Sequence, residues 1–158
     1  MTVTANAFDP ASMQRATDLL AYYLDDLQKK GNQICERLAS IGALRASIGF
    51  SRAIYPSGND VSISVEPISN GWAIHARGNA VLFIEFGAGA TLGYGHPEPD
   101  GYGPGTYNPD SDNWRNPKGW WYGDGQHTYG NPPAAAMYYA KEEVLRNIEQ
   151  VAREVFGE

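Results

Sequence analysis

The sequence predicts an α+β fold in which helices flank a small antiparallel sheet. Three observations carry this prediction. Apolar residues recur at helical spacing over the first third of the chain, alternate with polar residues in its middle, and return to helical spacing over residues 134–156. With 158 residues, the chain is expected to form a single domain spanning residues 1–158.

The first predicted element is helical and covers residues 10–46. Asp9 suits the N-cap position, and Pro10 suits the first helical position because its missing N–H has no partner there. A polar run at residues 29–32 interrupts the apolar periodicity, so the pattern fits either two helices or one long kinked helix. Cys35 falls within this pattern, and we interpret it as a helix residue rather than as a reactive thiol.

The middle of the chain predicts a meander of three to four antiparallel strands. Residues 50–55 form a plausible first strand. Residues 61–66 and 72–77 alternate apolar with polar side chains, as half-buried strands do. Between them, Asn70-Gly71 is a hairpin signal, because both residues accept positive φ.

Two further elements complete the prediction. Residues 80–86 form a short apolar segment whose length does not distinguish a helix from a strand. After Pro133, residues 134–156 carry the apolar stripe of a helix, which we expect to pack on the sheet.

A long Gly- and Pro-rich loop, residues 87–133, separates these last two elements. It holds 11 Gly, 7 Pro and eight Trp or Tyr, but a single Leu, Ile, Val or Met. Such a segment cannot build its own core, whereas a disordered linker is poor in aromatic residues. We interpret it as an extended arm whose rings contact another surface, and the alternative is that the rings pack on the chain's own sheet. The candidate contact residues are Tyr94, Tyr107, Trp114, Trp120, Trp121, Tyr122 and Tyr129.

Composition argues against several classes of protein. Twelve Lys and Arg against eighteen Asp and Glu give a net charge of −6, which disfavours a nucleic-acid binder. No apolar run approaches the ~20 residues that a transmembrane helix needs, so no membrane partner is expected. One cysteine cannot form an internal disulfide, and the first residues lack the pattern of a secretory signal.

The signals for catalysis or metal binding are weak. Glu85 lies in an apolar segment and would be a candidate general acid or base if it were buried. The interpretation we favour is an exposed glutamate or one paired with an arginine. No nucleophile motif is present, so we expect no enzymatic activity, no cofactor and no metal. The polar residues that match no metal-ligand spacing are His96, Asp100, Asp110, Asp112, Asp124 and His127.

Three short motifs follow one another in a recognisable order. Residues 44–48 read Leu-Arg-Ala-Ser-Ile before the predicted sheet, residues 85–89 read Glu-Phe-Gly-Ala-Gly after it, and Pro133 opens the last helix. This order resembles the small head–tail joining, or tail-completion, proteins of long-tailed bacteriophages (siphoviruses). The loop is longer and richer in Trp and Tyr than the usual form, and Pro-Ala-Ala replaces the usual Pro-Phe-Met. The residues that carry the likeness are Leu44, Ser47, Ile48, Glu85, Phe86, Gly87, Gly89 and Pro133.

The resemblance implies a structural virion protein of the phage neck, with no catalytic residues. Such a subunit forms a ring, expected to be a hexamer, that joins the DNA-filled head to the tail and lets DNA pass through its lumen. The implied partners are other copies of the chain, the connector or adaptor, and the tail-terminator or tail-tube proteins. The implied location is the head–tail junction of a virion assembled in the host cytoplasm. The alternative, from another class, is a carbohydrate- or cell-wall-binding module that uses the Trp and Tyr rings of the loop.

Overall fold

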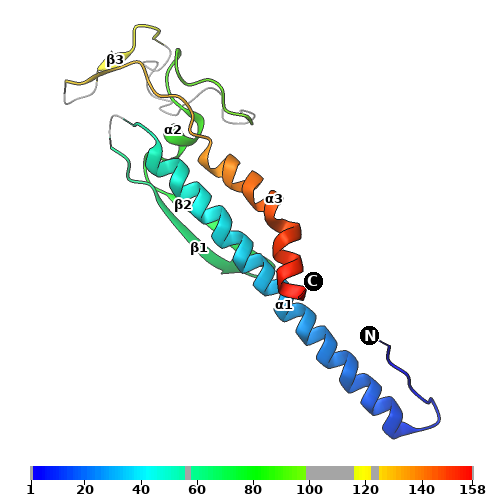
Figure 1. Cartoon of the computed structure of the whole chain (residues 1–158). Helices are drawn as coiled ribbons and strands as arrows, with labels where there is room; N and C mark the ends of the chain where they lie inside the picture. The colour runs from blue at the N-terminus through cyan, green and yellow to red at the C-terminus, as the bar shows by residue number, and fades with distance from the viewer. Residues whose placement is uncertain (1, 56–57, 99–115, 122–124, 158) are drawn as a thin grey trace.

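The computed structural model of the chain describes residues 2–55, 58–98, 116–121 and 125–157. Its mixture of helices and antiparallel strands confirms the α+β class (Figure 1). In chain order the elements are α1 (Pro10–Arg52), β1 (Ser62–Ile68), β2 (Gly71–Arg77), α2 (Val81–Phe86), β3 (Trp120–Trp121), β4 (His127–Thr128) and α3 (Ala136–Phe156).

α1 is one continuous helix of 43 residues, about 65 Å long. Of the two alternatives that the sequence left open, two helices or one long helix, the structure therefore has the single long helix. Across the polar interruption, Lys29 and Lys30 form ion pairs with Asp25 and Asp26 one turn earlier. Such pairs support a helix locally, because side chains four residues apart lie on the same face.

The two ends of α1 differ in how well the sequence predicts them. The Asp9 carboxylate accepts a hydrogen bond from the Ala11 N–H at 3.0 Å, as expected of an N-cap. At the other end the helix continues to Arg52, so the strand predicted over residues 50–55 is wrong. Phe50 is 2% exposed and lies in the core one helical turn after Ala46, so its apolar side chain belongs to the buried face of α1 rather than to a strand.

The central sheet has two strands rather than the three to four predicted. β1 and β2 pair antiparallel, with Val65 opposite Ile74 and Ile68 opposite Gly71, so the expected hairpin is confirmed. Its two turn residues are Ser69 and Asn70 rather than Asn70 and Gly71, and Gly71 is the first residue of β2. The meander is shorter because its first expected strand is the end of α1. A second small hairpin, β3 paired with β4, lies inside the long loop and was not predicted.

α2 settles the ambiguity over residues 80–86, because it is a short helix rather than a strand. The Asp60 carboxylate fixes its start. It accepts hydrogen bonds from the N–H groups of Asn79 at 2.7 Å and Ala80 at 2.9 Å. These bonds join the segment before β1 to the segment after β2.

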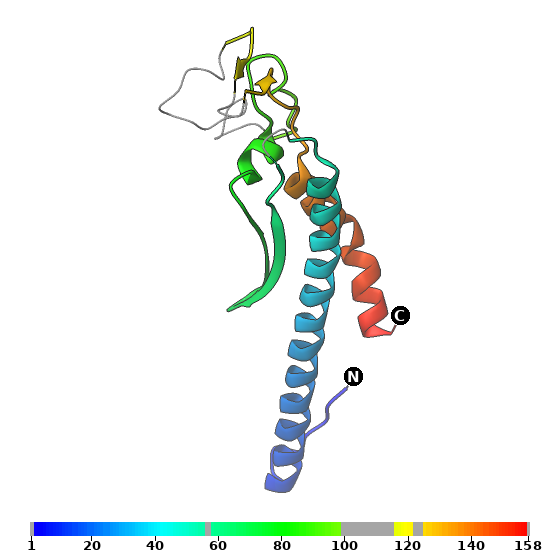
Figure 2. The ribbon, with the colours of Figure 1, turned by 90° about the vertical axis from the view of Figure 1, so that its left-hand side faces the viewer.

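α1 is the middle layer of the molecule, with the β1–β2 hairpin on one side and α3 on the other (Figure 2). Small residues of α1 permit this close packing. A Cβ added at Gly49 would lie 2.6 Å from the Ala136 Cβ, and one at Gly42 would lie 2.6 Å from the Ile74 Cδ1. The buried cluster comprises Ala46, Phe50, Ala80, Ile84, Ala136 and Ala140. Ile63 and Ala76 of the sheet pack against it, which confirms that the C-terminal helix packs on the sheet region.

The N-terminal part of α1 projects beyond this packed body, past the end of α3 (Figures 1 and 2). The last contacts of α3 with α1 are the ion pair of Glu154 with Arg37 and the Phe156 ring beneath Lys30. Before that point α1 carries many exposed apolar side chains: Met13, Leu19, Leu20, Tyr22, Tyr23 and Leu24. Among the described residues, no helix is both long and apolar enough to cross a bilayer.

Candidate functional site

The residues of the second and third motifs meet at the base of the long loop. Ala88 and Asn131 form an isolated antiparallel bridge, with N–H···O distances of 2.8 and 2.9 Å. Asn131 is buried, and its side-chain amide donates a further hydrogen bond to the Phe83 carbonyl. The two ends of the loop are therefore held together although many residues separate them in the chain.

Glycine is required at this junction for two reasons. Gly87 has a φ of 82°, in the left-handed region that favours glycine. A Cβ there would also lie 2.8 Å from the Pro133 backbone nitrogen. Gly87 of the second motif and Pro133 of the third are therefore direct neighbours, and the same holds for Gly89 and the Tyr129 carbonyl.

Glu85 is buried and holds the N-terminus of α3. Its carboxylate accepts hydrogen bonds from the N–H groups of Met137 at 2.9 Å and Tyr138 at 3.0 Å. α3 has no side-chain cap of its own, because its N-cap residue is Ala135, with a left-handed φ of 47°. Glu85 thus supplies from α2 the acceptors that the first turn of α3 needs, and its negative charge suits that end of the helix dipole.

The expectation that Glu85 is exposed or paired with an arginine is wrong. Its side chain is 7% exposed, and its side-chain partner is His96, whose Nε2 lies 3.3 Å from Oε1. His96 Nδ1 accepts a hydrogen bond from the Glu98 N–H, so Nε2 carries the proton and donates it to Glu85. The carboxylate is engaged by three donors, an arrangement that favours a structural role over acid–base chemistry.

His96 holds the beginning of the loop against α2 and α3. Its ring is tilted against the Phe86 ring, with 4.5 Å between their centres, and lies edge-on to the Tyr138 ring at 5.9 Å. Within the described residues no group of three or more His, Cys, Asp or Glu is arranged to hold a metal ion. Asp100, Asp110, Asp112 and Asp124 lie outside the described residues.

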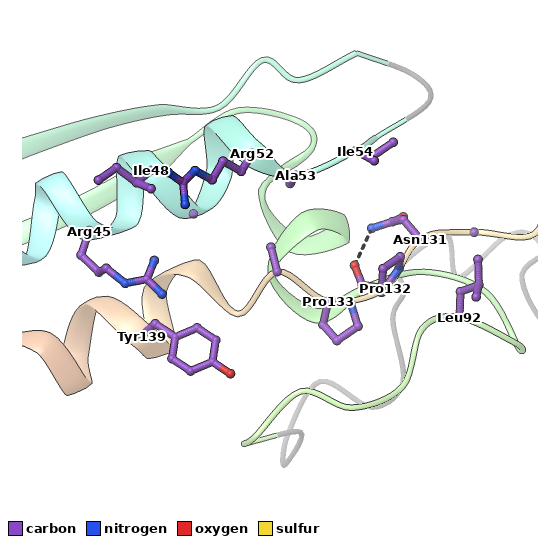
Figure 3. Close-up of a pocket in the computed structure, with 13 residues that line it drawn as sticks. Arg45, Ile48, Arg52, Ala53, Ile54, Leu92, Asn131, Pro132, Pro133 and Tyr139 are labelled. Atoms are coloured by element: carbon purple, nitrogen blue, oxygen red, sulfur yellow. Dashed lines mark hydrogen bonds between the residues drawn. The ribbon is translucent and has the colours of Figure 1, made fainter.

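Beside this junction lies an open groove of about 900 Å³, between the last turns of α1, the start of α3 and both ends of the loop (Figure 3). Arg45, Ile48 and Arg52 line its α1 side in a row, and Leu92, Pro133 and Tyr139 line the opposite side. The Arg45 guanidinium lies 5.2 Å from the centre of the Tyr139 ring. None of the described residues that line the groove is acidic, so this lining is apolar with two positive charges at its edge.

The first of the three sequence motifs lies at this groove or close to it. Ile48 lines it, while Leu44 and Ser47 are exposed on α1. Sequence reasoning missed the groove, although one signal was available. Between Glu36 and Asp60 the chain has three arginines and no acid, and Arg45 and Arg52 are two helical turns apart on the same face.

The aromatic residues of the loop are only partly described. Tyr94, Trp121 and Tyr129 are exposed, at 58%, 70% and 54%. Trp120 is half-buried, so it does not share this exposure. The His127 ring lies 4.6 Å from Trp121 and 4.9 Å from Tyr129, which makes a row of three rings. Tyr107, Trp114 and Tyr122 lie outside the described residues.

Comparison of the chain with protein-family models, with curated proteins and with solved structures found no match. The likeness to tail-completion proteins therefore stays a proposal that rests on the three motifs.

Proposed function

We propose that the chain is a structural subunit of the phage neck, which associates with further copies of itself into a ring between head and tail. The observation that carries this proposal is the distribution of apolar side chains. Among the described residues, twenty large hydrophobic side chains are exposed, whereas Phe50 and Ile84 are the large ones with almost no exposed surface. Exposed apolar surface on this scale is typical of protein interfaces.

The position of these residues supports the same proposal. About half of them lie at two ends of the molecule, six on the projecting part of α1 and four on the loop. A ring subunit needs two different contact surfaces, because each copy touches one neighbour on each side. The net charge of −6 is also suitable for a conduit that must not retain passing DNA.

Sedimentation velocity and negative-stain electron microscopy at rising protein concentration test the proposal. We expect closed oligomers that dissociate on dilution. Trp121→Ala should weaken association about tenfold or more, since exposed tryptophans are frequent interface anchors, and should leave the circular-dichroism spectrum unchanged. The control is Leu145→Ala, which removes a side chain of similar exposure from α3.

A chain that stays monomeric and binds neither a connector nor a tail-terminator ring contradicts the proposal. The row formed by Trp121, His127 and Tyr129 favours one competing function, binding of a glycan on exposed aromatic rings. Titration with peptidoglycan fragments separates the two, because tryptophan fluorescence would change only if the row binds sugar. No change at millimolar ligand rejects the glycan alternative.

A further inference from the structure

α1 carries two patches of opposite charge, one near each end. The first, the acidic patch, consists of Asp18, Tyr22 and Asp25. These residues share one face of the projecting part of α1 over two helical turns. All three are exposed, Tyr22 at 70%. Asp25 forms an ion pair with Lys29 at 2.6 Å, but such a solvent-exposed pair contributes little and is readily exchanged.

The second, the basic patch, consists of Arg45, Ile48 and Arg52 at the edge of the groove (Figure 3). Within the described residues neither arginine forms an ion pair with a carboxylate, and Arg45 interacts with the Tyr139 ring. Arg52 is exposed, and Ile48 is exposed at 37%. Two positive charges and an apolar side chain are therefore available in a molecule that is acidic overall.

The two patches match in spacing as well as in charge. Asp18 and Asp25 are two helical turns apart, about 10.5 Å along the axis, and so are Arg45 and Arg52. If the two helices lie side by side in parallel, each aspartate faces an arginine and Tyr22 points toward Ile48 and the groove. The contact then combines two ion pairs with an aromatic anchor in an apolar site, a common composition of protein interfaces.

One chain cannot make this contact with itself. Side chains at positions 18 and 45, and equally at 25 and 52, point in directions that differ by about 180° around the axis of an α-helix. The patches thus lie on opposite faces of α1, some 40 Å apart along its axis. A twofold dimer that satisfied both patches would need them on one face, so the contact is heterologous and each copy has two neighbours.

We infer that the acidic patch of one copy docks on the basic patch and groove of the next. This inference rests on the proposed function, because it names the surfaces by which the copies associate. Strictly parallel helices would repeat this contact as an open array, so closure into a ring requires each copy to be rotated relative to the previous one.

Charge reversal tests the inference. Asp18→Lys with Asp25→Lys reverses the acidic patch, and Arg45→Glu with Arg52→Glu reverses the basic patch. We expect each double variant alone to associate at least about tenfold more weakly than the unmodified chain in sedimentation velocity, since like charges then face each other. Arg146→Glu with Arg153→Glu is the control, because it changes the same charges at the same spacing on the exposed face of α3.

Mixing the two double variants gives the decisive result. In an equimolar mixture every patch meets a complementary one on the other variant, so we expect association to return with alternating subunits. Recovery on mixing also shows that both variants fold. If the double variants associate as the unmodified chain does, or if mixing restores nothing, the inference is overturned while self-association stands. If the unmodified chain itself does not associate, the proposed function fails as well.

Discussion

A single carboxylate, that of Glu85, connects three parts of the chain. It joins α2 to the first turn of α3 and to His96 at the start of the loop. The burial of Glu85, which the sequence did not lead us to expect, is therefore explained by backbone N–H groups that would otherwise lack acceptors. The sequence could not reveal this partner, because Met137 and Tyr138 contact Glu85 through main-chain N–H groups, which do not depend on the type of side chain.

Glu85→Gln should lower the free energy of unfolding by about 1–3 kcal/mol. The NH2 group of glutamine would face one of the two backbone N–H donors and could not accept its hydrogen bond. Chemical denaturation measures the change, and hydrogen exchange at Met137 and Tyr138 should accelerate. The control is Glu149→Gln, which alters an exposed ion pair of α3 and should change stability by less than about 0.5 kcal/mol. Equal stability of Glu85→Gln and the unmodified chain would contradict the assigned role.

Asp60 gives a pH-dependent prediction at the same scale. Hydrogen bonds from the backbone N–H groups of Asn79 and Ala80 lower the pKa of its carboxyl group below the usual value. Because the folded-state pKa lies below the unfolded one, the ionised carboxylate stabilises the fold above about pH 4, and this contribution disappears as the pH falls through the folded-state pKa.

Asp60→Asn should therefore melt at a lower temperature than the unmodified chain at pH 7, and the difference should shrink as the pH is lowered toward 3. Differential scanning calorimetry at several pH values measures it. A difference that is the same at every pH would mean that ionisation of Asp60 does not contribute.

At the scale of elements, the contact between α1 and α3 depends on the small residues of α1. Gly49 looks like a weak point in a helix, yet its missing side chain makes room for Ala136. Gly31 lies in the same helix with nothing within 4 Å of an added Cβ. A substitution at Gly31 therefore tests helix propensity alone, whereas a substitution at Gly49 also tests packing against α3.

Gly49→Ala should destabilise the chain by about 1–3 kcal/mol, because the added methyl group collides with α3. Gly31→Ala should stabilise it by up to about 1 kcal/mol, since alanine is the better helix former. Urea denaturation of both variants measures the opposite signs. If Gly49→Ala were also stabilising, the close approach of α1 and α3 would be refuted.

The elements differ in how far the sequence predicts them. The hairpin between β1 and β2 and the C-terminal helix depend on local patterns, and both are confirmed, with the turn one residue earlier and the helix starting two residues later than predicted. The extent of α1 depends on tertiary contacts instead. Phe50 fits a strand or a helix equally well by its neighbours, and its burial against Ala80 and Ile84 decides for the helix. In the candidate site, the sequence pointed to Glu85 and the glycines. It did not predict the groove, because the groove forms only where α1, α3 and both ends of the loop meet in the folded structure.

At the scale of the whole molecule, the body is small for the length of chain. Its buried cluster consists mostly of alanine, and long apolar side chains remain at the surface of the projecting helix. Alanine permits close helix packing but buries little apolar area, so each contact adds little stability. A neighbour covering α1 and the loop would complete the burial that a single copy lacks.

The positions of the groove-lining residues in the chain also determine when the groove can form during synthesis. Its Arg45 and Arg52 belong to the first third of the chain, but Pro133 and Tyr139 near the C-terminus form its other wall. The ion pair of Arg37 with Glu154 joins residues 117 positions apart. Contacts of such long sequence separation form late, because loop closure precedes them. A nascent chain therefore lacks a finished docking surface until its last helix has folded, and in the proposed ring only complete subunits could be incorporated.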